Sequence, residues 1–200
     1  MLILGVTGNI GCGKSSLSNI FKKNDIEIID ADKISRQIFA DKNLLQEVFV
    51  NFGEGIRNTD GSLDRKALGR IVFNNEDKLI ELNNLTHPKI KNKILEKINK
   101  AKKNNEKIIV IDAALLIEGG YTKIIDKLLI ITCDEDVQIK RIVDRDNCTR
   151  EDAISRINSQ MSQEEKIIYA DYIINNSSTL EELNIKAKKF IMYMKENWCE

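Results

Sequence analysis

The chain has few of the residues that indicate a disulfide-bonded, zinc-binding or membrane-spanning protein. Its four cysteines are far apart, and none has a C-x-x-C partner or a nearby histidine; they are Cys12, Cys133, Cys148 and Cys199. This spacing argues against a disulfide framework and a zinc site. No run reaches the roughly 18 apolar residues of a membrane span. The apolar start, residues 1–6, is too short for a signal peptide and has no basic flank. We therefore expect a cytoplasmic protein with no membrane partner.

Net charge is also lacking, because 31 Lys and Arg balance 31 Asp and Glu, for a formal charge of +0. No broad field exists to attract nucleic acid or an anionic membrane, so any anion site must be local. The 42% hydrophobic and 31% charged residues are typical of a globular chain. Its 200 residues suffice for one domain with insertions but not for two independent large domains. We expect a monomer or a weak homo-oligomer that binds no nucleic acid.

Short apolar runs predict five strands, at residues 2–6, 26–29, 108–111, 128–132 and 172–174. Uniformly apolar strands separated by helices favour an α/β fold with a parallel five-stranded sheet and helices on both faces. Helical patterns predict helices at residues 14–24, 33–39, 42–52, 64–73, 76–85, 88–104 and 179–198, with a further helical stretch at 136–170. The predicted organisation is a core of residues 1–32, 105–135 and 171–200, a helical insertion of 33–104, and a helical lid of 136–170.

One segment carries a specific chemical signal, the match to G-x-x-x-x-G-K-[ST] made by Gly8-Asn9-Ile10-Gly11-Cys12-Gly13-Lys14-Ser15. It follows an apolar strand and precedes an amphipathic helix, which is the context that a P-loop requires. Backbone N–H groups and the helix N-terminus can surround a polyphosphate. Lys14 can reach the β- and γ-phosphates, and Ser15 can ligate Mg²⁺. We predict that residues 8–15 and Ser16 bind ATP, in a sheet of the P-loop NTPase type. Cys12 is interpreted as a small loop residue, although the surrounding amides could lower its pKa.

Arginine is scarce and clustered, since four of eight arginines against 23 lysines lie at Arg141, Arg145, Arg150 and Arg156. Arg141 and Arg145 are four residues apart and would share one helix face. A planar guanidinium can clamp a transferring phosphoryl group, so these two are the best candidates. The alternative is a solvated helix with ion pairs to Asp144, Asp146 and Glu151.

Acidic residues follow the second and third predicted strands. Asp30 and Asp32 follow residues 26–29, and one of them could orient an acceptor hydroxyl and take its proton. The alternative is that both only cap the next helix. Asp112 ends the run 108–111 and could hold Mg²⁺ through water, or simply occupy a turn at the strand end. Because Asp30 also follows an apolar run, periodicity leaves open which acid serves the metal.

The only histidine, His87, precedes the only proline, Pro88. Thr86-His87-Pro88 predicts a helix start, with Thr or His as the cap and Pro in the first turn. Phosphoryl transfer depends mostly on positioning and charge stabilisation. For His87 we therefore favour capping over proton transfer.

Several segments occur in a specific order along the chain: Gly-Val-Thr-Gly-Asn-Ile-Gly-Cys-Gly-Lys-Ser at 5–15, Ile-Asp-Ala-Asp at 29–32 followed by Arg36, Asp-Gly-Ser-Leu-Asp-Arg at 60–65, His87-Pro88, Leu-Leu-Ile-Glu at 115–118, Arg156 with Gln160-Met161, and Ala170-Asp171 with Asn176. In these segments the sequence resembles the dephospho-CoA kinase family, over nearly the whole chain. The chain departs from the family at Ala114, because family members usually have Pro before the Leu-Leu-x-Glu segment. This difference affects the loop path beside the substrate.

The resemblance implies ATP-dependent phosphorylation of the ribose 3′-hydroxyl of dephospho-CoA, the last step of CoA synthesis, with Mg²⁺. It implies that Asp32 is the catalytic base and that the 33–104 insertion binds CoA. Lys14 and Ser15 would hold phosphate and Mg²⁺, with Asp112 as a second metal residue. Arg141 and Arg145 would close over ATP, with Arg141 and Lys14 in catalysis. Asn176 would lie near the adenine. The expected substrate-binding residues are Thr7, Asp32, Arg36, Arg65, His87 and Leu116.

Two other functions compete with this one. A kinase for nucleosides or nucleotides could use the same core. A P-loop switch with negligible catalysis is disfavoured for two reasons. The chain has no N-K-x-D guanine motif, and it does have Asp32 and the lid arginines, which a switch without catalysis does not need.

Overall fold

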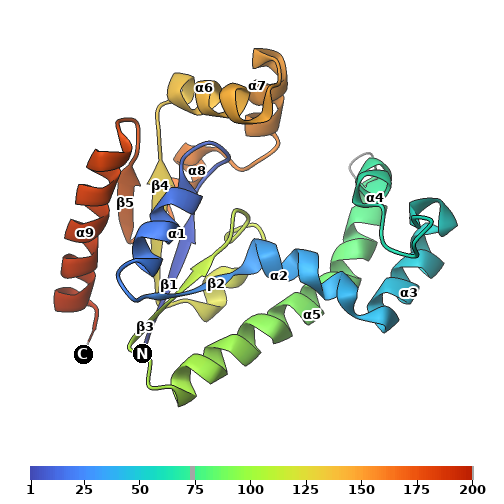
Figure 1. The fold of residues 1–200 in the computed structure, drawn as a ribbon, viewed down its shortest axis with the longest axis horizontal. Helices are drawn as coiled ribbons and strands as arrows, with labels where there is room; N and C mark the ends of the chain where they lie inside the picture. The colour runs from blue at the N-terminus through green and yellow to red at the C-terminus, as the bar shows by residue number, and fades with distance from the viewer. Residues whose placement is uncertain (73–74, 200) are drawn as a thin grey trace. The chain divides into compact units, whose positions relative to one another are not determined.

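The computed structural model describes residues 1–72 and 75–199, which form two compact units (Figure 1). The first unit combines Met1–Asp30 with Ile98–Glu200, and the second is Ala31–Lys97. The second unit overlaps the predicted insertion, residues 33–104. The roles predicted for the insertion and for the lid, residues 136–170, stay predictions.

The first unit is built on a parallel sheet of five strands, in the order β2-β3-β1-β4-β5. The strands are β1 (Leu2–Thr7), β2 (Glu27–Asp30), β3 (Ile108–Asp112), β4 (Lys127–Thr132) and β5 (Tyr172–Asn175). The predicted strands and fold class are therefore confirmed. The register pairs Asp112 with Val6 on one side and with Asp30 on the other, so the carboxyl ends of β1, β2 and β3 are level. This edge is where ligands bind in open α/β sheets.

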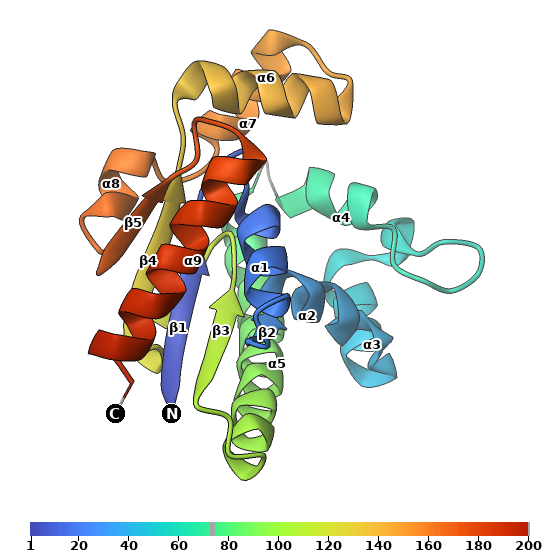
Figure 2. The same ribbon diagram turned by 60° about the vertical axis from the view of Figure 1, so that its left-hand side comes forward.

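Two helices, α1 (Lys14–Lys22) and α9 (Leu180–Asn197), pack on one face of this sheet (Figure 2). Their apolar residues recur at helical spacing and join the strand residues in one buried cluster. Phe190 of α9 contacts Phe21 of α1 and Tyr172 of β5, with ring centroids 6.1 and 4.6 Å apart. The final helix fixes α1, and α1 begins at the P-loop.

The remaining helices of the first unit are α6 (Glu135–Asp146), α7 (Arg150–Asn158), α8 (Gln163–Ile167) and the short 3₁₀ helix η3 (Tyr121–Ile124). The helices α7 and α8 begin with capping boxes at Thr149 and Ser162, whose side chains accept the backbone N–H three residues later. No helix of the described residues has both the length and the apolar character to cross a membrane.

The second unit is helical. It contains α2 (Ala31–Gln37), η1 (Ile38–Ala40), α3 (Lys42–Phe52), η2 (Glu54–Ile56), α4 (Arg65–Val72) and most of α5 (Glu76–Lys103). Asp41 caps α3 by accepting the N–H of Asn43 at 2.9 Å. The helix predicted at 33–39 in fact begins at Ala31, so Asp32 lies in its first turn. Phe73, the predicted end of another helix, lies outside the described residues.

The predicted helix start at Thr86-His87-Pro88 is wrong, because α5 continues through Pro88. A proline inside a helix removes one backbone hydrogen bond, here to Asn84, and costs about 3 kcal/mol or more in an unfavourable site. Asn84 and Pro88 are exposed, so water can solvate the freed carbonyl. The helix beyond Pro88 buries Ile94 and Ile98, which are 0% and 3% exposed. The Thr86 hydroxyl donates to the Leu82 carbonyl at 2.8 Å inside the helix and does not cap a new one. Thr86 and Ile90 are buried on the two sides of Pro88, so packing supports α5 both before and after the proline.

Candidate active site

The P-loop connects β1 to α1 at the carboxyl edge of the sheet. Gly13 precedes α1 in the left-handed region, at φ 93°. A Cβ on Gly13 would collide with the side-chain amide of Asn176. Only glycine fits both the backbone conformation and the space at this position.

Amide side chains from distant parts of the chain hold the P-loop in place. The Ile10 N–H donates to Gln160 Oε1 at 2.8 Å, and Gln138 Nε2 donates to the Ile10 carbonyl at 2.6 Å. Asn176 Nδ2 donates to the Cys12 carbonyl at 2.8 Å. Asn9 Nδ2 donates to the Met161 carbonyl at 2.9 Å. The loop is therefore preorganised by the protein, which lowers the entropy lost when a phosphate chain binds.

Lys14 and Asp112 form an ion pair at this edge, with side chains 15% and 8% exposed. The Ser18 hydroxyl donates to the other carboxylate oxygen of Asp112 at 2.6 Å. Of the two acids that the sequence left open for the metal, Asp112 forms an ion pair with the P-loop lysine. Asp30 lies beside it, as its register partner on β2.

The predicted metal residues, Ser15 and Asp112, offer a hydroxyl and a carboxylate. Within residues 1–72 and 75–199, no three His, Cys, Asp or Glu side chains form a metal-binding cluster. Mg²⁺ usually binds one or two protein oxygens, with waters and substrate phosphates as the other ligands. The donors at this edge therefore fit Mg²⁺ bound together with a nucleotide.

Arg141 of α6 lies against the P-loop. Its Nη1 is 3.5 Å from the Gly11 carbonyl, and its Nη2 donates to the Ser178 carbonyl at 3.2 Å. Arg145 instead makes two bonds to Asp146, at 2.7 and 2.8 Å. Arg145 holds the pKa of Asp146 below its usual range, with a further contribution from Arg156. Arg141 thus faces the loop, whereas Arg145 is in an ion pair of the kind that the alternative reading described.

Two predicted substrate residues are buried in the core. Thr7 is 0% exposed, and its hydroxyl donates to the Ala114 carbonyl at 3.1 Å. Leu116 is also 0% exposed, whereas its neighbour Leu115 is 51% exposed. Through its bond to Ala114, Thr7 supports the loop after β3. The substrate contacts predicted for Thr7 and Leu116 stay predictions.

The other predicted substrate residues lie in the second unit. Arg65 Nη2 donates to the Arg36 carbonyl at 2.5 Å, and its guanidinium carbon is 5.0 Å from the centroid of the Phe39 ring. Asp32 lies in the first turn of α2, two residues after the end of β2. His87 is exposed on α5. The unit thus brings Arg36 and Arg65 together.

Cys12 is fully buried, and its Sγ lies 3.4 Å from Sγ of Cys133. The hydrogen bond with Cys133 and burial raise the pKa of Cys12, whereas the suggested effect of the loop amides was to lower it. The same hydrogen bond, helped by Arg141, lowers the pKa of Cys133. Cys12 therefore stays protonated at neutral pH, as expected of a small loop residue.

Sequence reasoning assigned no role to Gln138, Ser18, Gln163 or Lys166. Gln138 and Lys166 are buried, at 1% and 0% exposure. Gln163 accepts the Cys133 N–H at 3.0 Å and donates to the Cys133 carbonyl at 2.9 Å. Their partners lie far away in the sequence, so no local pattern marks them.

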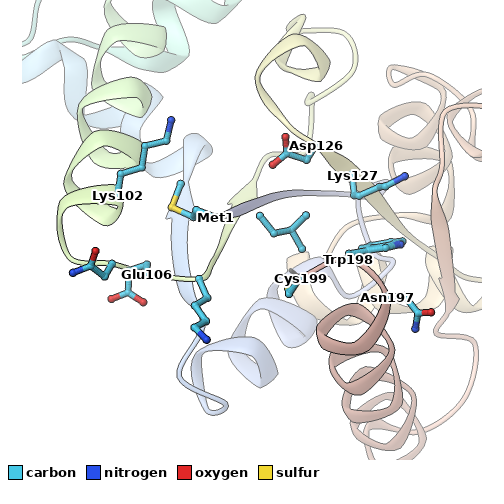
Figure 3. A pocket seen from close by; sticks show the side chains of 11 residues that line it. Met1, Lys102, Glu106, Asp126, Lys127, Asn197, Trp198 and Cys199 are labelled. Atoms are coloured by element: carbon cyan, nitrogen blue, oxygen red, sulfur yellow. The ribbon is translucent and has the colours of Figure 1, made fainter.

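A cavity of about 690 Å³ lies at the opposite, amino edge of the sheet (Figure 3). Leu2 and Lys127, at the starts of β1 and β4, line it together with Trp198. Lys127 lies 5.5 Å from the centroid of the Trp198 ring and pairs with Asp171 at 2.8 Å. This cavity is separate from the P-loop, which lies at the carboxyl edge.

The parallel sheet, the P-loop before α1 and the Lys14–Asp112 pair define a protein of the P-loop NTPase fold class. The family model for dephospho-CoA kinase matches residues 2–182. The dephospho-CoA kinase of Fusobacterium nucleatum is 40% identical over 190 residues, covering 95% of this chain and 97% of that protein. The chain belongs to the dephospho-CoA kinase family, whose members are transferases.

Solved structures agree with this assignment. Dephospho-CoA kinase from Campylobacter jejuni has a TM-score of 0.74 at 34% identity, covering 97% of each chain. The protein TT1252 from Thermus thermophilus has a TM-score of 0.83 at 26% identity, covering 96% of this chain and 97% of that one. The likeness thus extends over both units.

Proposed function

We propose that this chain transfers the γ-phosphoryl group of ATP to the ribose 3′-hydroxyl of dephospho-CoA, giving CoA and ADP. The observation that carries the proposal is the family match over residues 2–182. The reaction is the last step of CoA synthesis, and we place it in the cytoplasm. The protein would act as a monomer or a weak homo-oligomer, without nucleic acid.

In this proposal, residues 8–16 hold the triphosphate and Lys14 neutralises the β- and γ-phosphates. Binding of ATP would exchange the Lys14–Asp112 ion pair for contacts with phosphate and metal. Ser15 and Asp112 would hold Mg²⁺, which when bound supplies positive charge to the phosphate oxygens. Arg141, already beside Gly11, would stabilise the charge of the transferring group. Arg145 could contact ATP beside Arg141 only if its ion pair with Asp146 broke.

The proposed base is Asp32, which takes the proton of the 3′-hydroxyl as the ribose oxygen bonds to the γ-phosphorus. The bond from that phosphorus to the β,γ-bridging oxygen breaks, and its electron pair leaves with ADP. Two features support this role: Asp32 is in the first turn of α2, and the nearby Asp30 is the register partner of Asp112. Arg36, Arg65 and His87 would bind dephospho-CoA in the 33–104 insertion. Asn176, beyond its bond to the P-loop, would lie near the adenine.

A coupled assay of ADP release tests the proposal, with dephospho-CoA compared with a panel of nucleosides and with water alone. We expect ADP release that depends on dephospho-CoA. The negative control is Lys14→Ala, which should abolish the release because it removes the cation that neutralises the β- and γ-phosphates. Release with nucleosides but not with dephospho-CoA would indicate the competing kinase reading. Nucleotide binding without release would indicate a P-loop switch.

A further inference from the structure

The short helix α8 turns two polar side chains inward, three residues apart on one face. The side-chain amide of Gln163 accepts the N–H of Cys133 and donates to its carbonyl; Cys133 is the residue directly after β4. Its Oε1 also lies 3.4 Å from Sγ of Cys12, in the P-loop. Through Gln163, α8 is attached to the phosphate-binding loop.

The second inward side chain, Lys166, reaches the loop that follows β3. Its Nζ donates to the Ala114 carbonyl at 3.2 Å and pairs with Glu118 Oε1 at 3.1 Å. The Lys166 side chain is 0% exposed and that of Glu118 is 24% exposed. Thr7 donates to the same Ala114 carbonyl, at 3.1 Å. The bonded carbonyl is two residues beyond Asp112, which contacts Lys14 and Ser18.

A fully buried ammonium group is costly to desolvate, and an apolar side chain of similar size often stabilises a fold equally well. The ion pair alone therefore does not explain why a lysine occupies this position. Its contacts lie on the segment that carries Asp112, while Gln163 of the same helix holds the P-loop side. Lys166 thus connects the two parts of the site that must keep a fixed distance during phosphoryl transfer.

We propose that Lys166 is a positioning residue for phosphoryl transfer, which fixes the loop after β3, and with it Asp112, relative to the P-loop. The proposal rests on the kinase activity proposed above. It places the effect of Lys166 on turnover rather than on nucleotide affinity, because the lysine contacts neither the P-loop glycines nor Lys14 in the described structure.

The test compares Lys166→Met with the double variant Lys166→Met/Glu118→Leu, which removes both charges together. We expect Lys166→Met to lower Tm and to lower kcat by about tenfold or more, with the KM for ATP changed by less than about threefold. The double variant should recover Tm, because no unpaired charge remains, but its kcat should stay low. Lys188→Met, at an exposed lysine of α9, is the matched control and should leave both unchanged.

The variant Thr7→Val provides a second test of the proposal, and it leaves the Lys166–Glu118 ion pair in place. It removes the Thr7 hydrogen bond to the Ala114 carbonyl with a side chain of the same shape, so kcat should fall while the KM for ATP is kept. A double variant or a Thr7→Val variant with the kcat of the parent protein overturns the proposal. Failure of the proposed function would look different, because the parent protein itself would then release no ADP with dephospho-CoA.

Discussion

The P-loop can be tested through Gly13, whose substitution by alanine combines two separable costs. Gly13 has a φ of 93°, and alanine in the left-handed region costs about 1–2 kcal/mol. The new Cβ would also displace the Asn176 amide from the Cys12 carbonyl, which it now meets at 2.8 Å. Loss of a buried hydrogen bond adds about 1–3 kcal/mol. We therefore expect Gly13→Ala to lower the free energy of unfolding by about 2–5 kcal/mol.

Gly61 provides the matched control, because it also has a positive φ, of 83°, but its Cβ would meet nothing within 4 Å. In urea unfolding, Gly61→Ala should lower the free energy of unfolding by the cost of the backbone conformation alone, about 1–2 kcal/mol. Asn176→Ala combined with Gly13→Ala should destabilise by less than the sum of the single changes, since the collision is then relieved. Equal destabilisation by Gly13→Ala and Gly61→Ala would refute the reasoning, as would strict additivity in the double variant.

Three further predictions concern single side chains. Asp32→Asn should retain ATP binding and lower turnover on the order of 10²–10⁴-fold, because only the acceptor loses its base; unchanged turnover would remove Asp32 from the proposed role. Arg141→Lys should lower kcat more than it raises the KM for ATP, since a point charge replaces a fork beside Gly11; kinetics equal to those of the parent would mean a solvated arginine. Arg145 lowers the pKa of Asp146 from its ordinary 3.8, so this pair stabilises the fold above that pH and its contribution is lost as pH falls further. Acid unfolding should therefore show the parent more stable than Asp146→Asn at pH 7, with the two converging as the pH falls through the lowered pKa of Asp146; a stability gap that persists once Asp146 is protonated would contradict this.

The strands and the P-loop could be predicted because their signals are local. An apolar run such as 108–111 must be buried on both faces, and this property is visible in consecutive residues. The glycines and Lys14 of the P-loop likewise act within one turn of chain. The prediction at Pro88 failed because the local stop signal was outweighed by contacts on both sides of the proline. The Thr86 hydroxyl bonds to the Leu82 carbonyl within α5, and Thr86 and Ile90 are both buried.

The site residues divide in the same way. Lys14 and Asp112 were assigned from the motif and from a strand end, but their ion pair spans 98 residues. Thr7 and Leu116 stand beside reactive segments in the sequence, yet the strand and the following loop turn their side chains into the core. Gln138 has no local signature, and Gln160 was noted only within a segment that carries the family resemblance. What defines the place of both in the site is the backbone of Ile10, which they contact.

The sequence by itself determined that this chain would form a parallel α/β sheet with a phosphate-binding loop, because strand burial and loop conformation depend on neighbouring residues. Only the tertiary structure decided which groups surround that loop. Gln138, Gln160, Lys166 and Asn176 reach it, or the loop after β3 beside it, across 52 to 164 positions of the chain. Such contacts form only when the sheet brings the strand ends together, since hydrogen bonds depend on distance in space and not on separation along the chain.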